Sequence, residues 1–126
     1  MTTNTAEKKR ILLVEDDEGS SRYIETLLHD RWDLTTAFWA EDAWDILQTQ
    51  PIDLVLMDIS LPGDENGLDL TKRIRRESTN PDIPIIAVTA HAYASDRVNC
   101  LTAGCQEYIS KPFDKDAFFS LIERFI

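Results

Sequence analysis

The chain is poor in several residue types that mark particular classes of protein. It has four glycines and five prolines, and only two of its 126 residues, Cys100 and Cys105, are cysteines. Neither cysteine has the neighbouring cysteines or histidines that a zinc site needs, so we expect reduced, packed thiols. No apolar stretch approaches the roughly 20 residues that span a bilayer, and residues 1–9 contain no apolar segment of a signal peptide. These absences favour a cytoplasmic location.

Positive charge is also scarce. There are 13 lysines and arginines against 23 aspartates and glutamates, which gives a formal net charge of -10 at pH 7. Such a charge repels nucleic acid phosphates and anionic membrane surfaces, so we expect protein partners and cations rather than nucleic acid or a membrane. The length suits one domain with a single core. We predict a flexible tail at residues 1–9 and one domain at residues 10–126.

Short apolar runs alternate with amphipathic segments of helical length. The runs predict strands at residues 11–14, 34–37, 54–58, 85–89 and 107–110. The amphipathic segments predict helices at residues 20–29, 41–48, 67–76, 95–103 and 115–126. Strict alternation of this kind is typical of βαβ units. We therefore predict an α/β fold, a doubly wound sandwich around a five-stranded parallel sheet, in which Gly104 ends the fourth helix.

Polar residues suited to chemistry follow several of the predicted strands. Asp58 ends the third apolar run, Glu15 and Asp16 follow the first, Thr89 closes the fourth, and Lys111 follows the fifth. Because the carboxyl ends of parallel strands meet at one edge of a sheet, we expect these side chains to converge. Carboxylates together with a hydroxyl and a lysine indicate a site for a divalent cation and a phosphoryl group.

Four segments of the sequence resemble the response regulator receiver family, which is CheY-like. They are residues 14–16 (Val-Glu-Asp), residues 56–63 (Leu-Met-Asp-Ile-Ser-Leu-Pro-Gly), residues 88–90 (Val-Thr-Ala) and residues 108–112 (Tyr-Ile-Ser-Lys-Pro). Within the family, residues 104–112 are similar to single-domain DivK-like regulators and to receivers of hybrid histidine kinases. The resemblance covers nearly the whole chain and implies the strand order 2-1-3-4-5.

The resemblance implies a phosphoacceptor signalling protein of a two-component system or phosphorelay. Asp58 would accept a phosphoryl group from a histidine kinase or a histidine phosphotransfer protein. Mg²⁺ or Mn²⁺ would be the cofactor, held by the carboxylates of Glu15, Asp16 and Asp58 and by the backbone carbonyl of Ser60. Lys111 would neutralise charge on the transferred group. Such a chain is no conventional enzyme, because it catalyses only its own phosphorylation and dephosphorylation.

The same resemblance implies a conformational switch. The hydroxyl of Thr89 would bond a phosphoryl oxygen and move inward, and Tyr108 would occupy the space that Thr89 vacates. The two states would differ in a surface formed by the fourth helix, the fifth strand and the fifth helix, which would bind a downstream protein target.

Other matching positions have subsidiary roles. Ser60 and His91 stand where the family tunes dephosphorylation. Structural roles are implied for Gly67, Gly104 and Pro112, whose peptide bond with Lys111 would be cis.

Two departures from the family pattern leave a second function open. Glu15 stands where many receivers have aspartate, and residues 62–67 look one residue longer than the usual turn before the third helix. If either change spoils the cation site, the chain would be a docking module of the same fold that binds partners without phosphorylation. A phosphatase or a flavodoxin of similar topology is disfavoured, because residues 58–60 lack a second aspartate and no phosphate-binding loop follows the first strand.

Three bulky apolar residues have two interpretations each. Trp39 stands where receivers usually carry a small polar residue, and it either faces a partner or covers a loop. Phe119 and Ile126 lie seven residues apart on the predicted last helix and broaden its apolar stripe. They either form a partner or dimer patch or are ordinary exposed residues. We expect a monomer or a weak dimer.

Overall fold

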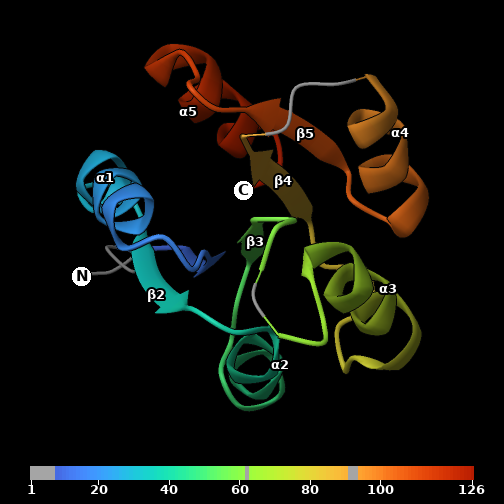
Figure 1. Cartoon of the computed structure of the whole chain (residues 1–126). Coiled ribbons are helices and arrows are strands. Elements are labelled where there is room, and N and C mark those ends of the chain that lie inside the picture. The colour runs from blue at the N-terminus through green and yellow to red at the C-terminus, as the bar shows by residue number, and fades with distance from the viewer. Residues whose placement is uncertain (1–7, 62, 91–93) are drawn as a thin grey trace.

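The computed structural model describes residues 8–61, 63–90 and 94–126 (Figure 1). In these residues, strands and helices alternate from one end to the other. The strands are β1 (Arg10–Val14), β2 (Asp33–Ala37), β3 (Leu54–Met57), β4 (Ile85–Thr89) and β5 (Glu107–Ser110). The helices are α1 (Glu18–Leu28), α2 (Ala40–Thr49), α3 (Gly67–Glu77), α4 (Ala94–Ala103) and α5 (Lys115–Glu123). Every element predicted from the sequence is present.

The five strands form one parallel sheet in the order β2-β1-β3-β4-β5. Strand β1 lies between β2 and β3, where Val14 is in register with Ala37 on one side and with Met57 on the other. Figure 1 shows α1 and α5 on one face of this sheet and α2, α3 and α4 on the other. The predicted fold class, the doubly wound arrangement and the strand order are confirmed.

Each face of the sheet has its own half of the core. In β1, Ile11 and Leu13 pack with residues of α1 and α5, whereas Leu12 and Val14 pack with residues of α2, α3 and α4. Because helices cover both faces, the central strands β1, β3 and β4 are continuous apolar runs rather than alternating ones. No described helix is both long and apolar enough to span a bilayer.

The two edge strands are less buried than the central ones. Strand β2 reads Asp-Leu-Thr-Thr-Ala, and only Ala37 at its end is buried. Strand β5 reads Glu-Tyr-Ile-Ser, and all of its residues are half-buried. Both edges therefore carry polar side chains between their apolar ones.

Side-chain caps fix where three of the helices begin. A carboxylate oxygen of Asp17 accepts a hydrogen bond from the backbone N–H of Ser20 (2.7 Å), and α1 begins directly after Asp17, earlier than predicted. Asn66 and Asp69 form a reciprocal capping box at the start of α3. Asp114 caps α5 as Asp17 caps α1. Because each cap fixes where a helix begins, it also fixes where the preceding loop ends, and these loops carry the site.

Arg75, near the end of α3, connects this helix to two other segments, residues 81–83 and residues 104–106. Its guanidinium donates hydrogen bonds to the backbone oxygens of Gly104 (2.9 Å), Pro81 (2.7 Å) and Ile83 (2.8 Å) and to the side-chain oxygen of Gln106 (2.8 Å). Gly104 has a φ of +118°, and a Cβ atom there would lie 2.8 Å from Cγ of Arg75. Both the backbone conformation and the close approach require glycine at this position.

Helix α5 ends at Glu123, three residues before Ile126, so the predicted helix at residues 115–126 is too long at its end. Phe119 on α5 and Ile126 beyond it both pack within the chain. The ring of Phe119 packs edge-on against Trp32, with 6.1 Å between ring centroids, and the guanidinium of Arg31 lies 4.8 Å from the Phe119 centroid. Phe119 and Ile126 are half-buried and pack against the core under α1 and α5. Phe119 therefore belongs to the intrachain packing rather than to a surface patch free for a partner.

Candidate functional site

Three carboxylates meet at the C-terminal edge of the sheet. Glu15 and Asp16 follow β1, and Asp58 follows the neighbouring strand β3. Each side chain offers one oxygen, and the three oxygens all lie within 4.8 Å of one another. The sheet brings them together because adjacent parallel strands end side by side. Such a set of oxygens suits Mg²⁺, which binds a few carboxylates and keeps several waters.

Glu15 is the most buried member of this carboxylate cluster, with 1% of its surface exposed. Its Oε1 atom forms an ion pair with Nζ of Lys111, from the loop after β5. Its Oε2 atom is buried and has no hydrogen-bond partner among the described residues. Burial raises the pKa of Glu15 to about 7; the Asp58 carboxylate adds to the rise and Lys111 opposes it. A cation between Glu15 and Asp58 would give the buried oxygen a partner. The residues present therefore fit a divalent cation.

Asp58 is held through both its backbone and its side chain. Its backbone N–H donates to the carbonyl oxygen of Val14 (2.9 Å), and its Oδ1 atom accepts a hydrogen bond from the backbone N–H of Ser60 (3.0 Å). Strand β3 ends at Met57, so Asp58 is the first residue beyond the strand rather than its last residue. These contacts fix the carboxylate relative to β1 and β3.

Lys111 and Thr89 lie at the ends of the adjacent strands β5 and β4. The backbone N–H of Lys111 donates to the carbonyl oxygen of Thr89 (2.7 Å), and the peptide bond between Lys111 and Pro112 is cis. Thr89 is fully buried. The structure thus pairs Lys111 with the carboxylate cluster and places Thr89 at the same edge of the sheet.

Tyr108 lies on β5 and packs against the half of the core under α2, α3 and α4. Its hydroxyl is buried and has no hydrogen-bond partner in residues 8–61, 63–90 and 94–126, and burial raises the pKa of this hydroxyl. A buried hydroxyl without a partner costs free energy. The switch role that the resemblance gives to Tyr108 stays a prediction.

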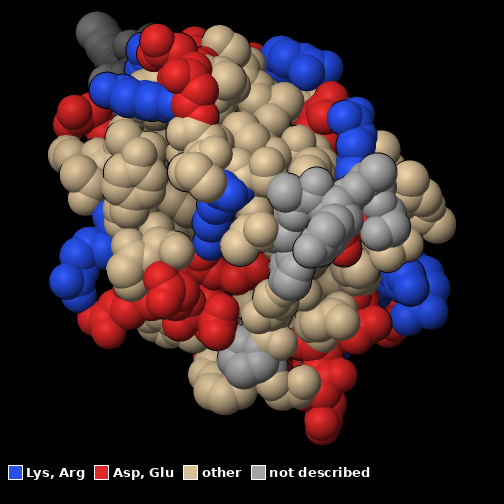
Figure 2. Space-filling view, turned by 45° about the horizontal axis from the view of Figure 1, so that its top comes forward, with Lys and Arg blue, Asp and Glu red and all other residues tan. Residues whose placement is uncertain are grey.

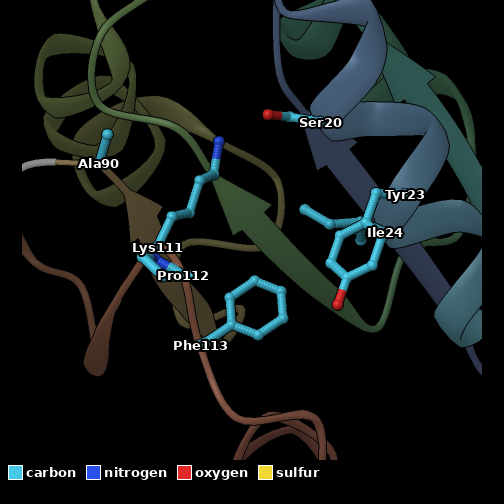
Figure 3. A pocket seen from close by; sticks show the side chains of 7 residues that line it. All are labelled: Ser20, Tyr23, Ile24, Ala90, Lys111, Pro112 and Phe113. Atoms are coloured by element: carbon cyan, nitrogen blue, oxygen red, sulfur yellow. The ribbon is translucent and has the colours of Figure 1, made fainter.

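A pocket of about 460 Å³ lies beside Lys111 (Figure 3). Helix α1 provides one wall, and the loops after β4 and β5 provide the other. The lining residues are Ser20, Tyr23, Ile24, Ala90, Lys111, Pro112 and Phe113. The rings of Tyr23 and Phe113 both line it, with centroids 6.2 Å apart. This pocket could not be predicted from the sequence, because it forms between segments far apart in the chain.

Two parts of the predicted site lie outside the described residues. They are His91, to which the resemblance gave a role in dephosphorylation, and Pro62, which begins the lengthened loop. The rest of that loop is described, and it ends at Asn66, the cap of α3. Ser60 is exposed and contributes the hydrogen bond to Asp58.

The surface reflects the excess of acidic residues in the composition. Figure 2 shows acidic side chains gathered in the lower half of one face, where they border a basic side chain near the centre. With a formal net charge of -10, the molecule attracts cations and basic partners.

A carboxylate cluster at the C-terminal edge of a five-stranded parallel sheet, paired with a lysine from the last β–α loop, is the arrangement of a receiver domain. The family model described as the response regulator receiver domain matches residues 11–123. The chain therefore belongs to the response regulator receiver family of two-component systems, as its motifs indicated.

Among curated proteins, the chain is similar to the transcriptional regulatory protein DltR of Streptococcus agalactiae. The two are 38% identical over 114 residues, which cover 90% of this chain and 50% of DltR. The chain thus spans about half the length of this relative.

Solved receiver structures show the same fold. The receiver domain of sensor histidine kinase PA1611 from Pseudomonas aeruginosa is 34% identical, with a TM-score of 0.85 over 94% of this chain and 97% of that one, and it is described with a magnesium ion coordinated in its active site cleft. A CheY-like receiver domain protein from Methanospirillum hungatei is 28% identical, with a TM-score of 0.83 over 94% of this chain and 93% of that one.

Proposed function

We propose that the chain is the phosphoacceptor of a two-component system or phosphorelay. Asp58 receives a phosphoryl group from the phosphohistidine of a histidine kinase or a histidine phosphotransfer protein, in a reaction that depends on Mg²⁺. The observation that carries this proposal is the convergence of oxygens from Glu15, Asp16 and Asp58 within 4.8 Å, with Lys111 paired to the cluster. The magnesium ion described in the similar PA1611 receiver supports it.

In the proposed reaction, a carboxylate oxygen of Asp58 forms a bond to phosphorus as the phosphorus–nitrogen bond of phosphohistidine breaks. The electron pair of the broken bond stays on the imidazole nitrogen, so the donor leaves as histidine and Asp58 becomes an acyl phosphate. The backbone N–H of Ser60, 3.0 Å from Oδ1, holds the carboxylate in position. A carboxylate has no proton to lose, so no general base is needed.

Positive charge has to offset the anionic phosphoryl group, because catalysis of this transfer rests on positioning and electrostatics. A bound Mg²⁺ would supply Lewis-acid charge next to the phosphoryl oxygens. The carboxylates of Glu15, Asp16 and Asp58 and the backbone carbonyl of Ser60 would hold it. Lys111 is the second source of charge: its ammonium, which pairs with Glu15, would turn to the phosphoryl oxygens.

Thr89 and Tyr108 would carry the signal from Asp58 to a binding surface on α4, β5 and α5. The phosphoryl group brings new oxygens, to one of which the Thr89 hydroxyl would donate a hydrogen bond. Tyr108 lies on β5, the strand next to that of Thr89, and its buried hydroxyl has no partner in the described part of the chain. A downstream protein that prefers one arrangement of these residues would shift the population toward it.

The pocket beside Lys111 would receive the phosphodonor protein. A protein that delivers a phosphoryl group to Asp58 has to cover the open edge of the sheet. Tyr23, which is 54% exposed, and Phe113 offer it an aromatic contact beside Lys111. Tyr23→Ala should then slow transfer from a protein donor while leaving transfer from a small donor unchanged.

Residues 10–126 would form the receiver domain, since the first strand begins at Arg10. The tail predicted for residues 1–9 lies largely outside the described residues and stays a prediction. Ser60 and His91 likewise stay predicted as the positions that tune dephosphorylation. In this function the chain modifies its own aspartate and is no conventional enzyme.

The test is the mass of the intact protein after incubation with phosphoramidate and Mg²⁺. We expect one phosphoryl adduct on the wild type and on Asp116→Asn, an exposed aspartate of α5 that serves as a matched control. We expect none on Asp58→Asn or in EDTA. An adduct that persists on Asp58→Asn would refute the assignment of Asp58. No adduct on the wild type, together with no Mg²⁺ binding, would favour a docking module that works without phosphorylation.

A further inference from the structure

Two large aromatic side chains are exposed where the chain passes from β2 to α2. Phe38 is 43% exposed and the adjacent Trp39 is 51% exposed. Single exposed apolar residues are ordinary. Trp39, however, lines a pocket, and a side chain of another protein that enters this pocket would contact its ring.

The pocket is small and acidic. It has a volume of about 240 Å³ and is lined by Trp39, Ala40, Glu41, Gly63, Asp64 and Glu65. A Cβ atom on Gly63, whose φ is +92°, would lie 3.7 Å from the ring of Trp39, so the indole rests close to this loop. The volume is below the roughly 300 Å³ at which pockets for small-molecule ligands begin, and it suits a single side chain.

A contact within the chain shows which kind of side chain binds to a tryptophan ring that lies beside carboxylates. On the neighbouring Trp44, the guanidinium of Arg73 lies 4.0 Å from the ring centroid. Two walls of the pocket, Glu41 and Glu65, hold that guanidinium with ion pairs of 3.3 Å each. An arginine stacked on an indole and paired with carboxylates is therefore already formed beside the pocket. In the described part of the chain, no cation stacks on Trp39.

We propose that the Trp39 pocket binds an arginine side chain of a partner protein. The indole provides a face for cation–π stacking, and Asp64, which is exposed and forms no ion pair with a described residue, provides a free carboxylate. Arginine fits better than lysine, because its planar guanidinium can stack on the ring and pair with a carboxylate at once. The net charge of -10 attracts such a partner.

This arginine site lies on the same edge of the sheet as Asp58, because the loops after β2 and β3 both leave their strands there. A partner anchored at Trp39 therefore faces the carboxylate cluster. Binding at the site does not require phosphorylation of Asp58, so the proposal stands apart from the proposed function.

The test is a titration of ¹⁵N-labelled protein, kept in saturating Mg²⁺, with a short capped glycine peptide that carries one arginine. We expect the indole N–H of Trp39 and the backbone amides of Gly63 and Asp64 to shift. The same peptide with citrulline in place of arginine should cause no shift. Salt should weaken the binding, because exposed charges are screened.

Matched variants locate the site. Trp39→Ala should weaken binding about fivefold, as expected when one cation–π contact is lost. Phe38→Ala, which removes the adjacent exposed aromatic side chain that does not line the pocket, should have no effect. Asp64→Asn should also weaken binding, whereas Asp116→Asn on α5 should not. The Trp39 side chain makes no capping hydrogen bond to α2, so its removal spares the helix start.

Three results would overturn the proposal. The first is an equal response to the citrulline peptide. The second is a set of shifts centred on Glu15 and Asp16 instead of Trp39. The third is a shift that depends on protein concentration rather than on peptide, which would indicate a second copy of the chain as the occupant.

Discussion

A Cβ atom at Gly67 would lie 2.2 Å from the backbone oxygen of Asp58. Helix α3 therefore begins directly against the backbone of the residue that carries the proposed chemistry, and the N–H of Gly67 donates to the carbonyl oxygen of Ile59 (3.3 Å). Only a residue without a side chain allows this approach. The position of α3 and that of Asp58 are thus set by the same contact.

We expect Gly67→Ala to lower the free energy of unfolding by about 1–3 kcal/mol, because overpacking forces the backbones apart. Gly19→Ala is the matched control: its Cβ atom would meet only the carboxylate of Asp17, at 3.4 Å. Alanine favours helix α1 there by up to about 1 kcal/mol. Urea denaturation of both variants measures the difference. Equal effects would contradict the close contact at Gly67.

The raised pKa of Glu15 makes stability depend on pH. The folded protein holds the Glu15 proton up to about pH 7, whereas the ordinary pKa is 4.5. This group's contribution to stability is therefore fully present below about pH 4.5 and is lost as the pH rises through 7. The full loss is on the order of 3 kcal/mol, and Glu15→Gln should abolish it. Glu18→Gln, at an exposed position, should keep it.

Unfolding free energies in EDTA at about pH 5 and about pH 8 check this dependence. The wild type should lose more stability between the two than Glu15→Gln does. Parallel losses in the two proteins would show that Glu15 is not responsible.

Lys111→Ala should separate catalysis from metal binding. Without the ammonium, phosphorylation of Asp58 by phosphoramidate should slow on the order of 100-fold, the size of effect seen when one electrostatic contact to a transition state is removed. Mg²⁺ affinity should be kept or rise, because Glu15 loses a competing cation. Lys115→Ala, on α5, is the control. Calorimetry and a mass time course measure the two quantities, and an equal loss of both would contradict these roles.

Arg75→Met should destabilise the protein by about 2–4 kcal/mol, because four acceptors lose charged hydrogen bonds at once. Arg76→Met should change stability by less than about 0.5 kcal/mol, since its ion pair with Glu77 is exposed. Thermal or urea unfolding compares the two neighbours. A similar small effect for both would show that Arg75 does not connect α3 to the loops around it.

The two cysteines should resist thiol reagents in the folded protein. Burial raises the pKa of Cys100 to about 12 and also raises that of Cys105, so both thiols stay protonated. A chromogenic disulfide reagent should label neither thiol natively and both in guanidinium chloride. Fast labelling of either one without denaturant would contradict the buried positions.

Much of the carboxylate cluster could be predicted from the sequence, because it depends on where strands end. Glu15, Asp16 and Asp58 follow buried apolar runs, and a parallel sheet aligns the ends of such runs at one edge. The resemblance to receivers then supplied the strand order, which the structure confirms. The meeting of these residues at one edge follows from the direction of the strands alone, without knowledge of side-chain orientation.

Contacts that depend on the direction of side chains could not be predicted from the sequence. The ion pair of Lys111 with Glu15 joins residues at opposite ends of the chain. The packing of Phe119 on Trp32 joins the last helix to the turn after the first helix, so a residue that the sequence left open as a partner contact is half-buried within the chain. The Trp39 pocket likewise forms only when the loops after β2 and β3 come together.

The polar character of the outer strands has a consequence for how the protein behaves at high concentration. A sheet edge presents unpaired N–H and C=O groups to which another chain can add a strand. Here one border is a five-residue strand that starts with Asp33, and the other is a four-residue strand that starts with Glu107. Short, charged borders discourage growth into fibres, so the same parallel sheet that exposes its ends to chemistry protects its sides from aggregation.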